Sequence, residues 1–127
     1  MKKILVVDDL EEVRQLVGAT LVRAKYQIIT ARDGLVAIEK AKEEKPDLII
    51  MDIAMPGAVN GLEATRILKD DPATSGCPII VLTGKNLSEN FQNCFDAGAD
   101  CCFSKPFSPL KLIQKVEELL GSKPRST

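Results

Sequence analysis

Residues 4–9 read Ile-Leu-Val-Val-Asp-Asp, an apolar run that ends directly in two carboxylates. The run is rich in β-branched residues and lacks polar alternation, which is typical of a strand buried on both faces of a parallel sheet. Similar runs at residues 48–51 and 79–82 end at Asp52 and Thr83. In open parallel sheets, ligands bind in the crevice at the carboxyl ends of the strands. The polar residues that follow these runs are therefore predicted to form one site.

Helical patterns alternate with these apolar runs. Weaker strands are predicted at residues 26–30 and 101–103, the second followed by Lys105. Strict alternation of five strands and five helices, with right-handed crossovers, predicts an α/β, flavodoxin-like, doubly wound sandwich whose five-stranded parallel sheet has the order 2-1-3-4-5. Helices are predicted at residues 13–24, 37–45, 62–69, 89–97 and 109–120, with Asp33, Asn60, Ser88 and Ser108 as N-caps.

Length and charge limit the possible functions. The 127 residues fit one domain, predicted over residues 1–120, with a flexible tail or the start of a linker at residues 121–127. A net charge of -1 without a cluster of Lys and Arg predicts neither direct DNA binding nor membrane binding. The apolar run near the amino terminus is too short for a signal peptide or a membrane span, so a cytoplasmic location is expected.

Histidine is absent, and there are four cysteines. A histidine base, a histidine metal ligand and an internal phosphohistidine relay are therefore excluded, and any histidine chemistry must come from a partner. No C-x-x-C spacing occurs, so the thiols are predicted to be reduced, small apolar residues. Cys101 and Cys102 are predicted to fill space on opposite sides of their strand, with redox sensing as the alternative. The other two cysteines are Cys77 and Cys94.

The predicted pocket holds several carboxylates, which repel one another unless a cation or protons offset their charge. Mg²⁺ suits such a pocket, because it prefers oxygen ligands and keeps positions open for water or phosphate oxygens. Asp52 is ionised at neutral pH and can act as a nucleophile without a base, so it can accept a phosphoryl group as an aspartyl phosphate. The Thr83 hydroxyl and the Lys105 ammonium are then expected to contact the phosphoryl oxygens.

Five motifs in order carry a resemblance to a known family: Val7-Asp8-Asp9, Met51-Asp52 with Met55-Pro56, Leu82-Thr83-Gly84, Gly98-Ala99-Asp100 and Lys105-Pro106-Phe107. Over residues 3–120 the chain resembles the receiver domain of two-component response regulators, of the single-domain chemotaxis-regulator type. The resemblance implies that Asp52 is the phosphoacceptor and that Thr83 and Lys105 bind the phosphoryl group. It also implies a Mg²⁺ ion held by Asp8, Asp9, Asp52 and the Ala54 carbonyl, and a cis Lys105-Pro106 bond.

The resemblance further implies the partners. The phosphodonor is a phosphohistidine on a sensor histidine kinase or a histidine phosphotransfer protein, and the phosphorylated domain signals by binding a downstream protein target. No enzymatic activity is expected beyond the domain's own phosphoryl transfer and dephosphorylation. The alternatives are a phosphorylation-independent interaction module and a receiver domain that is part of a larger hybrid protein. Family members usually carry an aromatic residue three positions before the lysine, where this chain has Cys102, which is too small to switch a comparable surface.

Other functions fit these residues less well. A haloacid-dehalogenase-type phosphatase needs a second aspartate two residues after the nucleophile, where this chain has Ala54. A flavodoxin-like flavin binder needs a phosphate loop rich in hydroxyls or amides, where this chain has Asp8 and Asp9. Asp9 also stands just before a predicted helix and is expected to cap it while binding the metal.

Overall fold

Strands and helices alternate along the whole chain. The computed structural model describes residues 2–53, 55, 57, 59–84, 87–105 and 107–121, with the backbone alone described for residues 87–91. The elements are β1 (Lys3–Val7), α1 (Glu11–Arg23), β2 (Gln27–Ala31), α2 (Gly34–Glu44), β3 (Leu48–Asp52), α3 (Gly61–Asp70), β4 (Ile79–Thr83), α4 (Leu87–Asp96), β5 (Cys101–Ser104) and α5 (Pro109–Leu119). The strands form one parallel sheet in the order β2-β1-β3-β4-β5, so the predicted fold class and strand order are confirmed.

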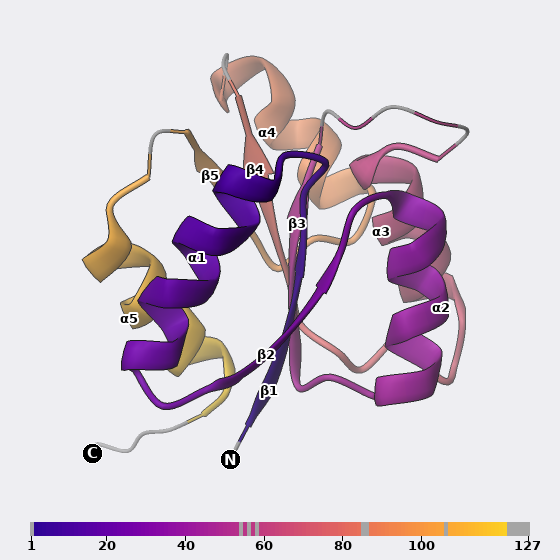
Figure 1. Cartoon of the computed structure of the whole chain (residues 1–127). Helices are drawn as coiled ribbons and strands as arrows, with labels where there is room; N and C mark the ends of the chain where they lie inside the picture. The colour runs from indigo at the N-terminus through magenta and orange to yellow at the C-terminus, as the bar shows by residue number, and fades with distance from the viewer. Residues whose placement is uncertain are drawn as a thin grey trace.

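Helices cover both faces of the sheet (Figure 1). The face beneath α1 and α5 and the face beneath α2, α3 and α4 each hold a separate apolar core. Successive side chains of a strand point to opposite faces, so Ile4 and Val6 enter one core while Leu5 and Val7 enter the other. Burial on both faces explains why the interior strands consist of continuous apolar runs.

The edge strands are less buried than the interior strands. Every residue of β3 and β4 is buried, whereas β2 and β5 contain exposed or half-buried positions because each of them pairs with only one neighbour. The weaker apolar signal at residues 26–30 and 101–103 follows from this difference. Within the described part of the chain, no helix combines the length and the apolar character needed to cross a membrane. Of the predicted tail at residues 121–127, only Gly121 is among the described residues.

Three of the predicted helix caps are confirmed. The Asp33 side chain accepts a hydrogen bond from the Val36 N–H at 2.9 Å, and Ser108 accepts one from the Lys111 N–H at 3.3 Å. Asn60 and Glu63 form a capping box, in which each side chain accepts a hydrogen bond from the other residue's backbone N–H. The starts of α2, α3 and α5 are therefore fixed by local side-chain bonds that the sequence already indicates.

Two other predicted caps are wrong. The helix α4 begins at Leu87, so Ser88 lies inside its first turn. Serine lowers helix stability only slightly at an interior position, so a serine in the sequence does not by itself mark where a helix begins. The helix α1 begins at Glu11 with Leu10 as its N-cap and no side-chain cap bond, so Asp9 does not cap it. Asp8 replaces Asp9 in part, because its Oδ1 accepts the Leu10 N–H at 3.0 Å.

The register of the sheet brings the carboxyl ends of its strands to one edge. Val7 at the end of β1 pairs with Met51, one residue before the end of β3. On the other side of β3, Asp52 pairs with Leu82, so Thr83 extends one residue further toward the same edge. The residues at the carboxyl ends of β1, β3, β4 and β5 therefore lie side by side at one edge of the sheet.

Candidate functional site

Three aspartates meet at the carboxyl edge of the sheet. Asp8 and Asp9 follow β1, and Asp52 is the last residue of β3. One carboxylate oxygen from each of the three lies within 4.8 Å of the other two. Asp8 and Asp52 are 1% and 3% exposed, whereas Asp9 is exposed to solvent. The predicted convergence of the three carboxylates is thus confirmed.

Lys105 supplies positive charge to this cluster. Its Nζ lies 3.0 Å from Asp8 Oδ2 and 3.1 Å from Asp52 Oδ1, so one ammonium bridges two buried carboxylates. Burial by itself lowers the pKa of Lys105, but the hydrogen bonds and charges of Asp8 and Asp52 outweigh this effect and raise the pKa above 10.5. Lys105 therefore remains protonated throughout the physiological pH range.

Thr83 ends β4 at the same edge of the sheet. It is 2% exposed, and its backbone carbonyl accepts the Lys105 N–H at 2.8 Å. This bond ties the chain after β5 to the end of β4 and helps to place the Lys105 side chain between the aspartates. The strand ends thus bring together the five polar residues that the sequence singled out. The Ala54 carbonyl and the Lys105-Pro106 peptide bond lie outside the described residues, so their predicted roles remain predictions.

Asp8 is held at three of its oxygens. Besides the bonds from Leu10 and Lys105 to its carboxylate, its backbone carbonyl accepts a hydrogen bond from Arg14 Nη1 at 2.7 Å. Arg14 lies in α1, so the bond joins the end of β1 to the helix that follows it. Sequence reasoning missed this contact, because an arginine in the first turns of a helix reads equally well as a surface charge.

Gly61 packs directly on the backbone of Asp52. A Cβ atom added at Gly61 would lie 1.9 Å from the Asp52 carbonyl oxygen and 2.8 Å from Ile53 Cα. The Gly61 N–H donates to the Ile53 carbonyl at 3.0 Å, so the first turn of α3 rests on the end of β3. Sequence reasoning missed this role, because the pair Asn60-Gly61 reads as an ordinary turn.

The oxygen donors of this cluster fit a Mg²⁺ ion. Mg²⁺ binds oxygen at about 2.1 Å in an octahedron, so adjacent ligands lie about 3.0 Å apart and opposite ligands about 4.2 Å apart. The carboxylate oxygens of Asp8, Asp9 and Asp52 all lie within 4.8 Å of one another, so rotations of the side chains can bring them to these spacings. Exposed Asp9 leaves the cluster open to water on one side, as an ion that keeps water ligands requires.

The buried charge of Asp52 is expected to reduce stability. Burial and the charge of Asp8 raise the pKa of Asp52 above its usual value of 3.8, and Lys105 offsets only part of this shift. Because the folded protein binds this proton more tightly than the unfolded chain does, stability is highest below pH 3.8 as far as Asp52 is concerned. This contribution is lost as the pH rises through the folded-state pKa.

Asp52→Asn is therefore expected to stabilise the protein at neutral pH, on the order of 1 kcal/mol, because it removes the buried charge while keeping the shape of the side chain. Urea unfolding in EDTA over a range of pH measures the effect, and the difference from wild type should shrink toward acidic pH. Asp70→Asn, at an exposed aspartate in the last turn of α3, is the control and should change little. Equal stability of Asp52→Asn and wild type at neutral pH would contradict the expectation.

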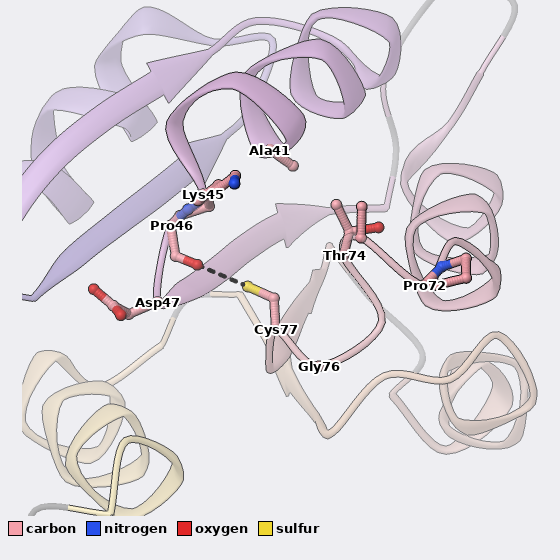
Figure 2. Close-up of a pocket in the computed structure, with 9 residues that line it drawn as sticks. Ala41, Lys45, Pro46, Asp47, Pro72, Thr74, Gly76 and Cys77 are labelled. Carbon is pink, nitrogen blue, oxygen red and sulfur yellow. Dashed lines mark hydrogen bonds between the residues drawn. The ribbon is translucent and has the colours of Figure 1, made fainter.

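A pocket of about 450 Å³ lies at the opposite end of the sheet, before β3 and β4 begin (Figure 2). The Cys77 Sγ points toward the Pro46 carbonyl oxygen, 3.4 Å away, and burial raises the pKa of this thiol to about 11. A thiol with so high a pKa is a poor nucleophile at neutral pH. The candidate site is therefore the aspartate cluster, and not this pocket. The pocket is lined by Ala41, Lys45, Pro46, Asp47, Pro72, Ala73, Thr74, Gly76 and Cys77.

Comparison with known proteins identifies the family. The response regulator receiver domain model matches residues 4–117. The transcriptional regulatory protein ResD of Bacillus subtilis is 42% identical over 118 residues, which cover 93% of this chain and 48% of ResD. The polar-differentiation response regulator DivK of Brucella anthropi is 34% identical over 120 residues, which cover 94% of this chain and 97% of DivK. The chain thus spans about half the length of the transcriptional regulators that it matches and nearly the whole length of DivK.

A solved structure agrees with these matches. The receiver domain of a sensor histidine kinase from Pseudomonas aeruginosa, described with a magnesium ion coordinated in its active-site cleft, superposes with a TM-score of 0.87 at 30% identity. The superposition covers 95% of this chain and 98% of that domain. The fold, the aspartate cluster at the carboxyl edge of the sheet and the family match agree, and this chain belongs to the receiver domains of two-component response regulators.

Proposed function

We propose that Asp52 accepts a phosphoryl group from a phosphohistidine of a sensor histidine kinase or a histidine phosphotransfer protein. The observation that carries this proposal is the Lys105 ammonium, which bridges Asp8 and Asp52 at 3.0 and 3.1 Å. It places a permanent positive charge beside a carboxylate at the end of a buried strand. Residues 1–127 contain no histidine, so the donor histidine must lie outside this sequence.

In the proposed reaction, a carboxylate oxygen of Asp52 attacks phosphorus while the bond from phosphorus to the donor histidine nitrogen breaks. The leaving nitrogen takes the bonding electron pair, and the product is an acyl phosphate on Asp52. Before the transfer, Lys105 Nζ lies between two carboxylates. After the transfer it donates a hydrogen bond to one phosphoryl oxygen, and the Thr83 hydroxyl donates to another. These residues position the group and offset its charge, and no proton has to leave Asp52.

Mg²⁺ is part of the proposal. Asp8, Asp9 and Asp52 would hold the ion, together with the Ala54 carbonyl that the resemblance implies. When bound, it supplies positive charge against the negative charge on the phosphoryl oxygens. Such a role also accounts for the placement of three carboxylates in one crevice, because a phosphoryl group could not approach them without added positive charge.

The proposed output is a change in binding to a downstream protein. The proposed assignment is a receiver domain over residues 1–120, which is supported by the described residues falling within a single domain. We further propose that it acts in the cytoplasm through protein partners. Its proposed catalysis is limited to its own phosphorylation and dephosphorylation. The proposal is supported by the fact that an aspartyl phosphate would occupy the Asp52 nucleophile until it is hydrolysed.

The intact mass of the protein after incubation with acetyl phosphate tests the proposal. Wild type is expected to gain about 80 Da, the mass of one phosphoryl group in a covalent intermediate, in the presence of Mg²⁺. EDTA should prevent the gain, and Asp52→Asn should abolish it. Asp70→Asn is the matched control and should gain the same mass as wild type, because this exposed aspartate lies in the last turn of α3, away from the cluster.

A phosphotransfer protein carrying phosphohistidine serves as a second donor for the same mass measurement. Failure of both donors would overturn the proposal and favour an interaction module that works without phosphorylation. An undiminished gain in Asp52→Asn would place the acceptor elsewhere in the chain.

A further inference from the structure

Two buried thiols from different elements meet beneath α4. Cys94 lies in α4 and is 0% exposed, and Cys102 lies in β5 and is 7% exposed. Their Sγ atoms are 2.7 Å apart, and both cysteines are free thiols in the structure. A disulfide has an S–S distance of about 2.05 Å, so the sulfurs need to approach by only about 0.7 Å more to form one.

The other two cysteines are in different surroundings. Cys101, the neighbour of Cys102 in β5, packs against the core under α1 and α5, whereas Cys94 and Cys102 share the core on the other face of the sheet. Cys77 lies before β4 begins, and its Sγ is directed at the Pro46 carbonyl oxygen. The geometry therefore favours one pairing, Cys94 with Cys102.

Burial keeps this pair reduced until an oxidant reaches it. Burial and the adjacent Cys94 thiol raise the pKa of Cys102 to about 12. The thiolate is the reactive form, so exchange with bulky disulfides is disfavoured on grounds of both pKa and access. The high pKa slows the reaction with any oxidant, so oxidation of this pair is slow, and access decides which oxidant can react. A peroxide is small enough to approach a buried thiol, and Cys102, the more exposed of the two, is the first sulfur that it can reach.

We propose that Cys94 and Cys102 are a redox-active pair that a peroxide oxidises to an intramolecular disulfide joining α4 to β5. The Cys102 sulfur attacks a peroxide oxygen, the O–O bond breaks, and water leaves when hydrogen peroxide is the oxidant, so that Cys102 becomes a sulfenic acid. The Cys94 sulfur then attacks the Cys102 sulfur. The displaced hydroxide takes the Cys94 proton and leaves as a second water. In sum, two thiols lose two electrons and two protons, and one peroxide becomes two waters.

The disulfide would hold one element of the sheet to one helix. Residues 94 to 102 form a short loop that contains the end of α4 and the turn into β5, and closing it removes freedom from the unfolded chain. Cys102 also pairs in the sheet with Val81 of β4, two residues before Thr83. Oxidation therefore fixes α4 against the strands next to the candidate phosphoryl site. This modification is independent of the proposed phosphorylation of Asp52.

Intact mass and peptide mapping after treatment with hydrogen peroxide test the proposal. Folded wild type is expected to lose about 2 Da, the mass of the two hydrogens removed when one disulfide forms. Asp-N protease cuts before Asp96 and Asp100, so it separates residues 71–95 from residues 100–127. The two peptides should remain linked until a reductant is added. The thermal midpoint of the oxidised protein should be about 5–10 °C higher than that of the reduced protein.

Variants identify the sulfurs. The double variant Cys77→Ser/Cys101→Ser keeps only the proposed pair and should still lose the two hydrogens. Cys94→Ala should not lose them, and its Cys102 should instead stop at the sulfenic acid, which dimedone traps. Oxidative refolding of the same double variant in glutathione disulfide allows the bond to form even if peroxide does not reach the folded pair. The proposal is overturned if peroxide does not link the folded pair, even where refolding does, or if Cys94→Ala loses the same mass as wild type.

Discussion

Gly61→Ala is expected to lower the free energy of unfolding by about 3 kcal/mol or more, an overpacking effect at the upper end of its usual range. The added methyl group would meet the Asp52 carbonyl oxygen at 1.9 Å, and backbone atoms cannot move aside as the end of a flexible side chain can. Either α3 must shift away from β3, which strains the Asn60 cap, or the end of β3 must move. Both movements disturb the same few residues.

The substitution is also expected to reduce phosphorylation of Asp52. A displacement of about 1 Å at a reacting group costs roughly 100-fold in rate. Because the methyl group presses on the backbone of Asp52 itself, the carboxylate should lose its placement beside Lys105. The initial rate of mass gain from acetyl phosphate measures this effect in the part of the population that remains folded.

Two other glycines provide controls for the added methyl group. Among the described residues, a Cβ atom at Gly76 or at Gly84 meets no heavy atom within 4 Å, and Gly84 directly follows Thr83. Gly76→Ala and Gly84→Ala should therefore leave the urea midpoint close to that of wild type. If Gly61→Ala proves as stable as these two variants, α3 does not rest on β3 in the way described.

Lys105→Met is expected to destabilise the protein by about 2–3 kcal/mol at neutral pH without divalent cations. Removing one partner of a buried ion pair leaves an uncompensated charge, at a typical cost of about 3–5 kcal/mol, and the 23% exposure of Lys105 reduces that cost. Here the loss leaves Asp8 and Asp52 facing each other without their shared cation. The penalty should decline in acid, where protons neutralise the carboxylates.

A double-mutant cycle separates this charge effect from lost packing. Asp52→Asn in the Lys105→Met background should restore much of the stability, so the two changes should be strongly non-additive. Mg²⁺ should stabilise Lys105→Met more than wild type, because binding to the folded state alone raises stability and the carboxylates are no longer neutralised by the lysine. Lys111→Met, at an exposed lysine in the first turn of α5, is the control for removing a lysine. Additive effects of Lys105→Met and Asp52→Asn would show that the bridge carries no coupling energy.

Much of the fold can be predicted because its signals are local. The interior strands are buried on both faces, so each of them reads as an apolar run, and Asn60 and Ser108 place helix starts through bonds within one turn. The prediction for the start of α1 was wrong because two neighbouring aspartates compete for one N–H group. Asp9 is of a residue type that often caps helices, yet the Leu10 N–H donates to Asp8, whose carboxylate is also held by Lys105.

The site can be predicted to the level of its charged residues, because carboxyl ends of parallel strands must share an edge. The contacts that support these charged residues cannot be predicted, because they depend on distances between elements that no local sequence pattern encodes. Gly61 is required by the approach of α3 to the Asp52 backbone, and the pairing of Cys94 with Cys102 requires the exact seating of α4 on the sheet. The prediction that Cys101 and Cys102 face opposite sides of the sheet is confirmed, whereas the partner of Cys102 was missed.

The order of the strands also bears on how the chain folds during synthesis. β1 precedes the other strands along the chain but lies between β2 and β3 in the sheet. It can pair with β2 once α1 and β2 have been synthesised. Its other edge stays unpaired until β3, which follows α2, has been synthesised. Until Leu48–Asp52 leaves the ribosome, that edge is an unpaired, apolar template for other nascent chains. Because every strand pair is non-local, sheet assembly is intrinsically slow, and a chaperone that shields β1 would shorten the period in which nascent chains can aggregate.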